Sequence, residues 1–173
     1  IRSKFAYHLA ESFGSHAHLK AEIFSSSLKY EKTFSKLKTE IDRNKSEIFI
    51  KHHLDKYSEE LPPIWVSVEV MTMGQISSWY SNIKDRKYRQ VIAKYYDLDE
   101  KILSSFLHHL TIVRNTSAHH SRVWNRKFTI DFVLPNLPKE LNKKFNTFSR
   151  KYLYNTLVMC EYLLNIISED SSW

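Results

Sequence analysis

The chain has 173 residues, of which 42% are hydrophobic and 14% aromatic, so it is long enough to bury a core and is neither disordered nor fibrous. Its 2 glycines and 4 prolines argue against a many-stranded β fold, and no apolar run approaches the ~20 residues that span a bilayer. The net charge of +7 is compatible with a polyanionic partner. The single cysteine, Cys160, excludes an intrachain disulfide framework and indicates a reducing cytoplasm.

The first third of the chain carries two helical patterns. In residues 2–13, Phe5, Leu9 and Phe13 recur every four positions and predict a helix that Gly14 ends. Residues 29–57 place apolar side chains on one face and charged side chains on the other, which predicts a second, longer helix.

Three further helices are predicted after Pro62-Pro63, where neither proline can donate a backbone hydrogen bond. They cover residues 65–82, about 85–96 and 100–118. Asp85 and Asp99 are the expected N-caps of the second and third. The third has an apolar stripe made by Ile102, Leu103, Phe106, Leu107, Leu110 and Val113.

The remaining residues contain an irregular segment and a final helix. Residues 121–137 lack periodicity, and the last helix runs from 139 or 150 to 167. We therefore predict an all-α bundle of about five to seven helices, forming one domain over residues 1–173. Because the chain begins with Ile1 instead of Met, we expect it to be a piece of a longer protein.

The most informative segment is Arg114-Asn115-Thr116-Ser117-Ala118-His119-His120-Ser121, which ends the apolar run of the 100–118 helix. Arginine can hold a phosphate through two hydrogen bonds, and histidine can transfer a proton near neutral pH. Arg114 and His119 together are therefore the minimum set for cleaving RNA without a metal.

The spacing in this segment favours a homodimer. On a straight helix, positions four apart lie about 40° from each other and positions five apart about 140°. Asn115 and His119 therefore share a face, whereas Arg114 points elsewhere unless the helix begins, bends or ends there. Two copies that meet across a two-fold axis would bring both kinds of side chain to one phosphate.

Several strings resemble known families. Arg114-Asn115-x3-His119 is similar to the Arg-x4-His signature of HEPN ribonucleases. The chain more broadly resembles the Abi-like abortive-infection family of bacteria, of the AbiD/AbiF type, whose members usually carry further sequence before this point. The strings that carry this second resemblance are Ile1-Arg2-Ser3-x-Phe5-Ala6-Tyr7-His8-Leu9-Ala10, Leu61-Pro62-Pro63-Ile64-Trp65-Val66, Gly74-Gln75-Ile76-Ser77, and Ala118-His119-His120-Ser121-Arg122-Val123-Trp124-Asn125-Arg126.

The resemblance implies a HEPN-like helical bundle that cleaves RNA in anti-phage abortive infection or as a toxin, and that is the C-terminal part of a longer chain. It implies attack by the RNA's own 2′-hydroxyl with no metal or other cofactor, leaving a 2′,3′-cyclic phosphate. Its partners would be RNA, as substrate or bound noncoding RNA, and an antitoxin, with no membrane. The resemblance also implies a role for each motif residue: His119 transfers protons, Arg114 stabilises the transition state, and Asn115 orients the imidazole or a phosphate oxygen. The residues that would hold the RNA are His120, Arg122, Trp124 and Arg126.

Each of these residues also has a structural interpretation. Arg114 and His119 could be an ion-pair partner and a histidine favoured at the negative end of a helix. For Trp124 we favour packing on the bundle over base stacking, and we expect Trp65 in the core. The apolar neighbours Val66, Val70 and Met73 favour a buried Glu69 that pairs with Arg114. The alternative interpretation is that Glu69 is a solvent-exposed helix residue.

Two functional classes remain open. The first is the endoribonuclease, and the second is a non-catalytic RNA- or protein-binding HEPN module in a defence or toxin–antitoxin system. A metal site is not expected, because adjacent histidines such as His52-His53 point about 100° apart on a helix and chelate poorly.

Overall fold

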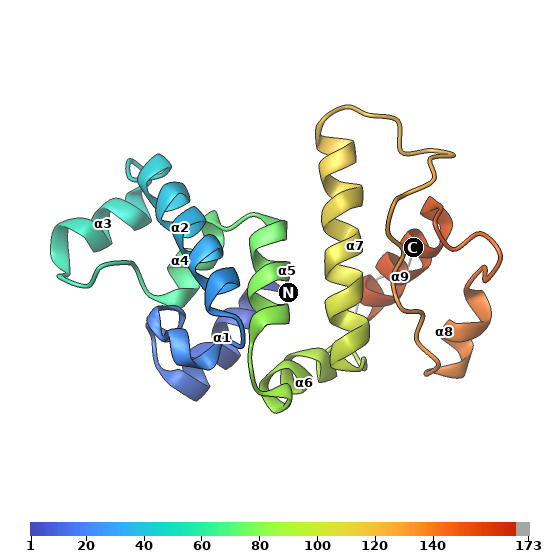
Figure 1. The fold of residues 1–173 in the computed structure, drawn as a ribbon, viewed down its shortest axis with the longest axis horizontal. Coiled ribbons are helices and arrows are strands. Elements are labelled where there is room, and N and C mark those ends of the chain that lie inside the picture. Colours follow the sequence, from blue (N-terminus) through green and yellow to red (C-terminus); the bar gives the residue numbers. More distant parts are fainter. Residues whose placement is uncertain (169–173) are drawn as a thin grey trace. The chain divides into compact units, whose positions relative to one another are not determined.

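All regular elements in residues 1–168, the part of the chain that the structure describes, are helices. The structure is a computed structural model (Figure 1). It confirms the predicted all-α fold class. The chain divides into two compact units, Ile1–Ile92 and a second that begins at Ala93, and each is described by itself below.

The first unit is built from paired helices. Helix α1 packs against α4, and α2 packs against both α4 and α5. Two short 3₁₀ turns, Ala17–Leu19 and Ala21–Ile23, follow α1. The helices are α1 (Arg2–Phe13), α2 (Ser27–Arg43), α3 (Ile48–Lys56), α4 (Ile64–Val70) and α5 (Met73–Asn82), and α6 (Arg86–Lys94) continues into the second unit.

Helix α1 ends as the sequence predicts. Gly14 follows its last residue with a φ of 88°, a conformation that residues with a side chain rarely adopt. The Gly14 N–H donates to the carbonyl oxygen of Ala10 at 2.8 Å, which satisfies one of the last backbone acceptors of the helix.

Two of the predicted helices are each divided in two. The 29–57 pattern breaks at Asn44, whose side-chain amide donates to the carbonyl oxygen of Glu40 at 2.7 Å and so ends α2. The 65–82 pattern breaks at Thr72, which forms a capping box with Gln75 and starts α5. Local hydrogen bonds from polar side chains thus override a continuous apolar pattern, and the described residues form nine α-helices.

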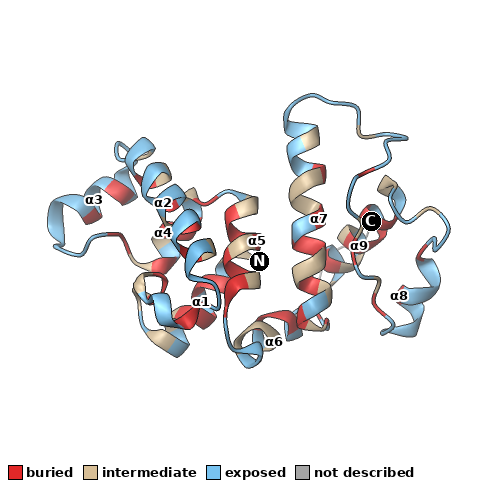
Figure 2. Cartoon of the chain, in the orientation of Figure 1, coloured by how far each residue is buried: buried red, intermediate tan, exposed pale blue. Residues whose placement is uncertain are grey.

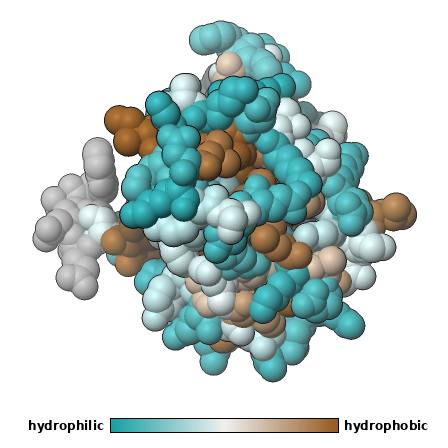
Figure 3. Space-filling view, turned by 90° about the vertical axis from the view of Figure 1, so that its left-hand side faces the viewer, coloured by the Kyte–Doolittle hydropathy of each residue, from teal (hydrophilic) through white to brown (hydrophobic). Residues whose placement is uncertain are grey.

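The core of the first unit is aromatic. The Trp79 side chain is 1% exposed, and its ring centroid lies 5.1 Å from that of Phe24 and 6.0 Å from that of Tyr30. Figure 2 shows buried residues, in red, on each of the packed helices α1, α2, α4 and α5. Some apolar side chains of α3 lie outside this core, among them Ile48, which is 86% exposed. Figure 3 views the molecule from the side on which α3 lies in Figure 1, and it shows apolar patches within a hydrophilic surface.

The second unit is organised around α7 (Glu100–Ala118), with α8 (Lys139–Lys144) and α9 (Leu153–Ile167). Asp99 caps α7 as predicted, since its side chain accepts from the Lys101 N–H. The intervening residues 121–137 contain no helix, also as predicted. The predicted final helix is present as α9, and the alternative start at 139 marks the separate α8.

A buried histidine ties this unit together. Nδ1 of His109 donates to the carbonyl oxygen of Ile130 at 2.7 Å, and Nε2 accepts from the Thr156 hydroxyl at 2.8 Å. The side chain is fully buried, and burial lowers the pKa of His109. The ring therefore connects α7, the irregular segment and α9, and it holds the helix whose last turn carries the Arg114–His119 motif.

None of the helices within residues 1–168 has the length and apolar character that crossing a bilayer requires.

Candidate functional site

The motif that the sequence singled out lies at the C-terminal end of α7. Val113 is the last buried residue of the helix, and Arg114 and Asn115 directly after it are exposed. The helix ends at Ala118, and His119 is its C-cap with φ −89° and ψ 20°. The imidazole and the guanidinium are therefore carried by the last turn of a helix that is anchored by its buried stripe.

The backbone around the two histidines is held by a Schellman motif. The Ser121 N–H donates to the carbonyl oxygen of Thr116 at 3.1 Å, and the His120 N–H donates to that of Ser117 at 3.0 Å. His120 occupies the left-handed position of this motif with a φ of 52°, where glycine is the usual residue. This arrangement fixes the direction in which the chain leaves the helix directly after His119.

Arg114 is oriented toward the face that His119 shares. Its Nη1 donates to Oδ1 of Asn115 at 3.2 Å. The carbonyl oxygen of Asn115 in turn accepts from the His119 N–H at 3.1 Å. On an uninterrupted helix Arg114 would point away from His119, but α7 ends at Ala118, just before His119, and the guanidinium of Arg114 donates to the Asn115 side chain. Asn115 thus contacts Arg114 through its side chain and His119 through its backbone.

The surroundings of the motif are basic and open to solvent. No Asp or Glu occurs between residues 101 and 130 of the sequence. Trp124 is 77% exposed, and Asn125 beside it has a left-handed φ of 50°. The exposed Arg and Lys side chains between residues 110 and 130 are Arg114, Arg122, Arg126 and Lys127. Such a surface attracts a polyanion.

Comparison with known proteins places this site within a family. A family model described as Abi-like protein matches residues 1–125, which is most of the 173-residue chain. The chain belongs to the Abi-like protein family. The match covers all of the first unit and α7, and it extends through the Arg114–His119 motif to Asn125. No curated protein and no solved structure matched the chain.

The structure corrects three expectations about side chains of this Abi-like protein. Trp124 does not pack on the bundle, since most of its surface is exposed. Trp65 is not in the core, because it is 52% exposed on the outer face of α4. Glu69, one turn further along the same face, is exposed instead of buried. Glu69 and Arg114 belong to different compact units, so their pairing stays a prediction.

His109 is a residue of the Abi-like chain whose role sequence analysis missed. Sequence analysis considered adjacent histidines only as poor chelates, but His109 lies on the apolar face of α7, three residues after the buried Phe106 and four before the buried Val113. A polar side chain within an apolar stripe is the signal that could have identified it, because such a group needs buried hydrogen-bond partners.

Proposed function

We propose that this Abi-like protein is a metal-independent endoribonuclease of the HEPN type, related to the AbiD/AbiF kind. Family membership suggests a role in abortive infection, which would make the activity an anti-phage or toxin activity in the cytoplasm. The observation that carries the proposal is that Arg114, Asn115 and His119 are all exposed at the end of one helix on a basic surface, where the Arg114 guanidinium donates to the Asn115 side chain. A cation, an amide and an imidazole therefore lie within six residues of one another at a place that RNA can reach.

In the proposed reaction the 2′-hydroxyl of one nucleotide attacks the adjacent phosphorus. The 2′-oxygen–phosphorus bond forms and the bond from phosphorus to the 5′-oxygen breaks, leaving a 2′,3′-cyclic phosphate and a 5′-hydroxyl. His119 takes the proton of the attacking hydroxyl, and an imidazolium returns a proton to the leaving oxygen. Arg114 offsets the negative charge that develops on the equatorial oxygens, and Asn115 orients the guanidinium.

A homodimer suits this chemistry. All three side chains are exposed on one chain, so the electrostatic effect of Arg114 would be weakened by water. A second copy that brings its own Arg114 and His119 to the same phosphate would exclude water from the site. It would also supply one histidine to remove a proton and another to donate one.

RNA would be held by the segment that follows the helix. His120, Arg122 and Arg126 are exposed and would bind backbone phosphates. The 77% exposure of Trp124 favours base stacking over packing, and stacking an exposed aromatic ring on a base typically stabilises the complex by about 1–3 kcal/mol. The same surface would suit a bound noncoding RNA or an acidic antitoxin.

A second candidate is a non-catalytic module that binds RNA or protein. The observation that favours this candidate is the exposure of His119, which lies at the surface of the single chain. Binding through Arg122, Trp124 and Arg126 would need no proton transfer.

The deciding experiment is cleavage of defined RNA in EDTA by the unaltered protein and by His119→Ala, Arg114→Ala, His108→Ala and Lys101→Ala. The last two remove an exposed histidine and an exposed cation from the same helix and are the matched controls. The ribonuclease proposal expects cyclic-phosphate ends from the unaltered protein and both controls, with loss of at least 100-fold in the first two variants. Equal RNA binding with no cleavage by any of the five proteins would support the binding module instead.

A further inference from the structure

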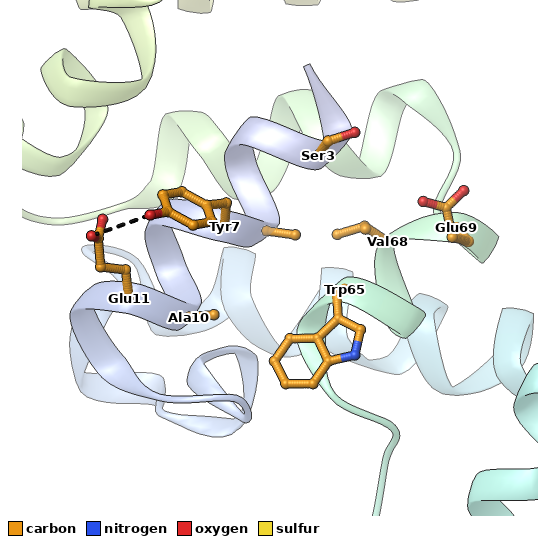
Figure 4. Close-up of a pocket in the computed structure, with 8 residues that line it drawn as sticks. Ser3, Tyr7, Ala10, Glu11, Trp65, Val68 and Glu69 are labelled. Carbon is orange, nitrogen blue, oxygen red and sulfur yellow. Dashed lines mark hydrogen bonds between the residues drawn. The ribbon is translucent and has the colours of Figure 1, made fainter.

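A groove outside the motif lies between α1 and α4 in the first unit. Its cavity volume is about 510 Å³, within the range of pockets that hold small ligands or a few side chains. Figure 4 shows Ala10 and Val68 between the two helices, Tyr7 and Glu11 on α1, and Trp65 and Glu69 on α4.

Small side chains create this hollow. Ala6 and Ala10 are four residues apart and so occupy one face of α1. Opposite them Val68 on α4 is 1% exposed. The helices are held together at one end by Arg2, which donates to the carbonyl oxygen of Met71 at 2.6 Å. The floor of the groove is therefore apolar and supported by a packed helix pair.

The rim exposes two aromatic rings that the fold does not bury. Tyr7 is 56% exposed and Trp65 is 52% exposed. Leaving large rings in water forfeits part of the free energy that their burial would supply. Both lie beside an apolar floor, so together they form a surface onto which a second apolar group can pack.

Two carboxylates complete the rim. Glu11 is 58% exposed, accepts from the Tyr7 hydroxyl at 3.5 Å and lies 3.3 Å from Nδ1 of His8. Glu69 is exposed on the other side of the groove. The eight residues that line the groove include no Lys or Arg, although the chain has a net charge of +7. The groove therefore repels phosphate and is suited to a cation.

We propose that this groove binds a segment of a partner protein that carries an apolar side chain next to Lys or Arg. The apolar side chain packs on Ala10 and Val68, and the cation lies between a carboxylate and the face of Trp65 or Tyr7. A cation that contacts a carboxylate and an aromatic ring at once gains both ion pairing and a cation–π interaction. Because Tyr7, Glu11, Trp65 and Glu69 all lie in the first unit, the proposal does not rest on ribonuclease activity.

The size of the groove sets the expected affinity. A contact of one or two side chains is far smaller than a standard protein interface, so we expect a Kd on the order of 10–100 μM for a short peptide. Such a site suits reversible recognition of a partner, in contrast to permanent assembly.

The test is selection of a random 12-residue peptide library on the unaltered protein, with Trp65→Ala used to remove peptides that bind elsewhere. The proposal expects enrichment of peptides with Lys or Arg beside a large apolar residue. The strongest peptide should shift the Trp65 indole N–H signal in an NMR titration. The Kd of that peptide should rise at least tenfold for Glu11→Gln/Glu69→Gln. It should stay within twofold for Glu140→Gln and Phe148→Ala, which alter an exposed carboxylate and an exposed ring in the second unit.

Three results would overturn the proposal. The first is enrichment of acidic peptides or of none. The second is a selected peptide whose affinity is unchanged by Glu11→Gln/Glu69→Gln. The third is displacement of the peptide from the Trp65 signal by a single-stranded RNA, which would assign the groove to nucleic acid. Urea unfolding of each variant confirms that it is folded, and the charge-neutral glutamine variant tests the proposal even where Trp65→Ala is unstable.

Discussion

Nη1 of Arg114 lies 3.2 Å from Oδ1 of Asn115, the residue whose carbonyl oxygen accepts the N–H of His119. Asn115 thus contacts the proposed cation through its side chain and the proposed proton-transfer residue through its backbone. The side-chain contact directs the guanidinium of Arg114 toward Asn115, which shares a helix face with His119.

Replacing Arg114 with Lys tests the bidentate role of the guanidinium. The charge remains, but the planar pair of donors is lost, so we expect kcat/KM for RNA cleavage to fall about 10- to 100-fold. RNA binding should change less than threefold, because the phosphate still meets a cation. A cleavage rate equal to that of the unaltered protein would show that Arg114 acts only through its charge.

The RNA-holding role of the segment after α7 is tested by salt dependence. Each phosphate contact contributes about 0.7 to the slope of log K against log salt for a single strand. Arg122→Ala/Arg126→Ala should therefore reduce that slope by about 1.4. Lys143→Ala, an exposed cation on α8, should leave it unchanged. Equal slopes for both variants would remove Arg122 and Arg126 from the RNA-binding surface.

The left-handed backbone at His120 predicts a stabilising substitution. His120 has a φ of 52°, and glycine adopts this conformation without steric cost. His120→Gly should raise the free energy of unfolding by about 0.5–1 kcal/mol, measured by urea denaturation. His120→Ala keeps a Cβ and should not stabilise the protein. A lower free energy of unfolding for His120→Gly would mean that the contacts of the imidazole stabilise the fold by more than the left-handed backbone conformation costs.

His109 is expected to contribute more to stability than its neighbour. His109→Ala leaves the Ile130 carbonyl oxygen and the Thr156 hydroxyl without a partner and opens a cavity, so we expect a loss of about 2–4 kcal/mol. His108 is exposed, and His108→Ala should change stability by less than about 0.5 kcal/mol. Chemical denaturation of both variants measures the difference, and similar losses would contradict the anchoring role.

Stability should decrease in mild acid because of His18. Burial, and then the nearby His16, lower the pKa of His18 from 6.5 to about 4. The folded state therefore keeps this side chain neutral while the unfolded state takes up a proton. Its contribution, about 3 kcal/mol, is present above pH 6.5 and is lost as the pH falls from about 6.5 to about 4. Urea unfolding at pH 7.5 and pH 5 should show this slope, and His18→Gln should flatten it. An unchanged slope in that variant would assign the acid sensitivity to other groups, such as His109.

Much of the secondary structure followed from local signals in the sequence. Gly14 ends α1 and Asp99 begins α7 at the predicted residues, because a cap acts through hydrogen bonds and dihedral angles within a few residues. The helix breaks at Asn44 and Thr72 were not predicted, because the apolar pattern continues across both positions. The hydrogen bonds that cause these breaks are nevertheless local as well. The Arg114–His119 motif itself was found from sequence alone.

What the sequence by itself determined is therefore the helical class, most helix ends and the residues of the candidate site. Only the tertiary structure decided which of the apolar and charged residues are buried. Trp65 and Glu69 lie on an apolar helix and yet line an open groove, and Trp124 is exposed beside the motif. The physical reason is that helical periodicity assigns a side chain to a face, whereas its burial depends on whether another element packs against that face.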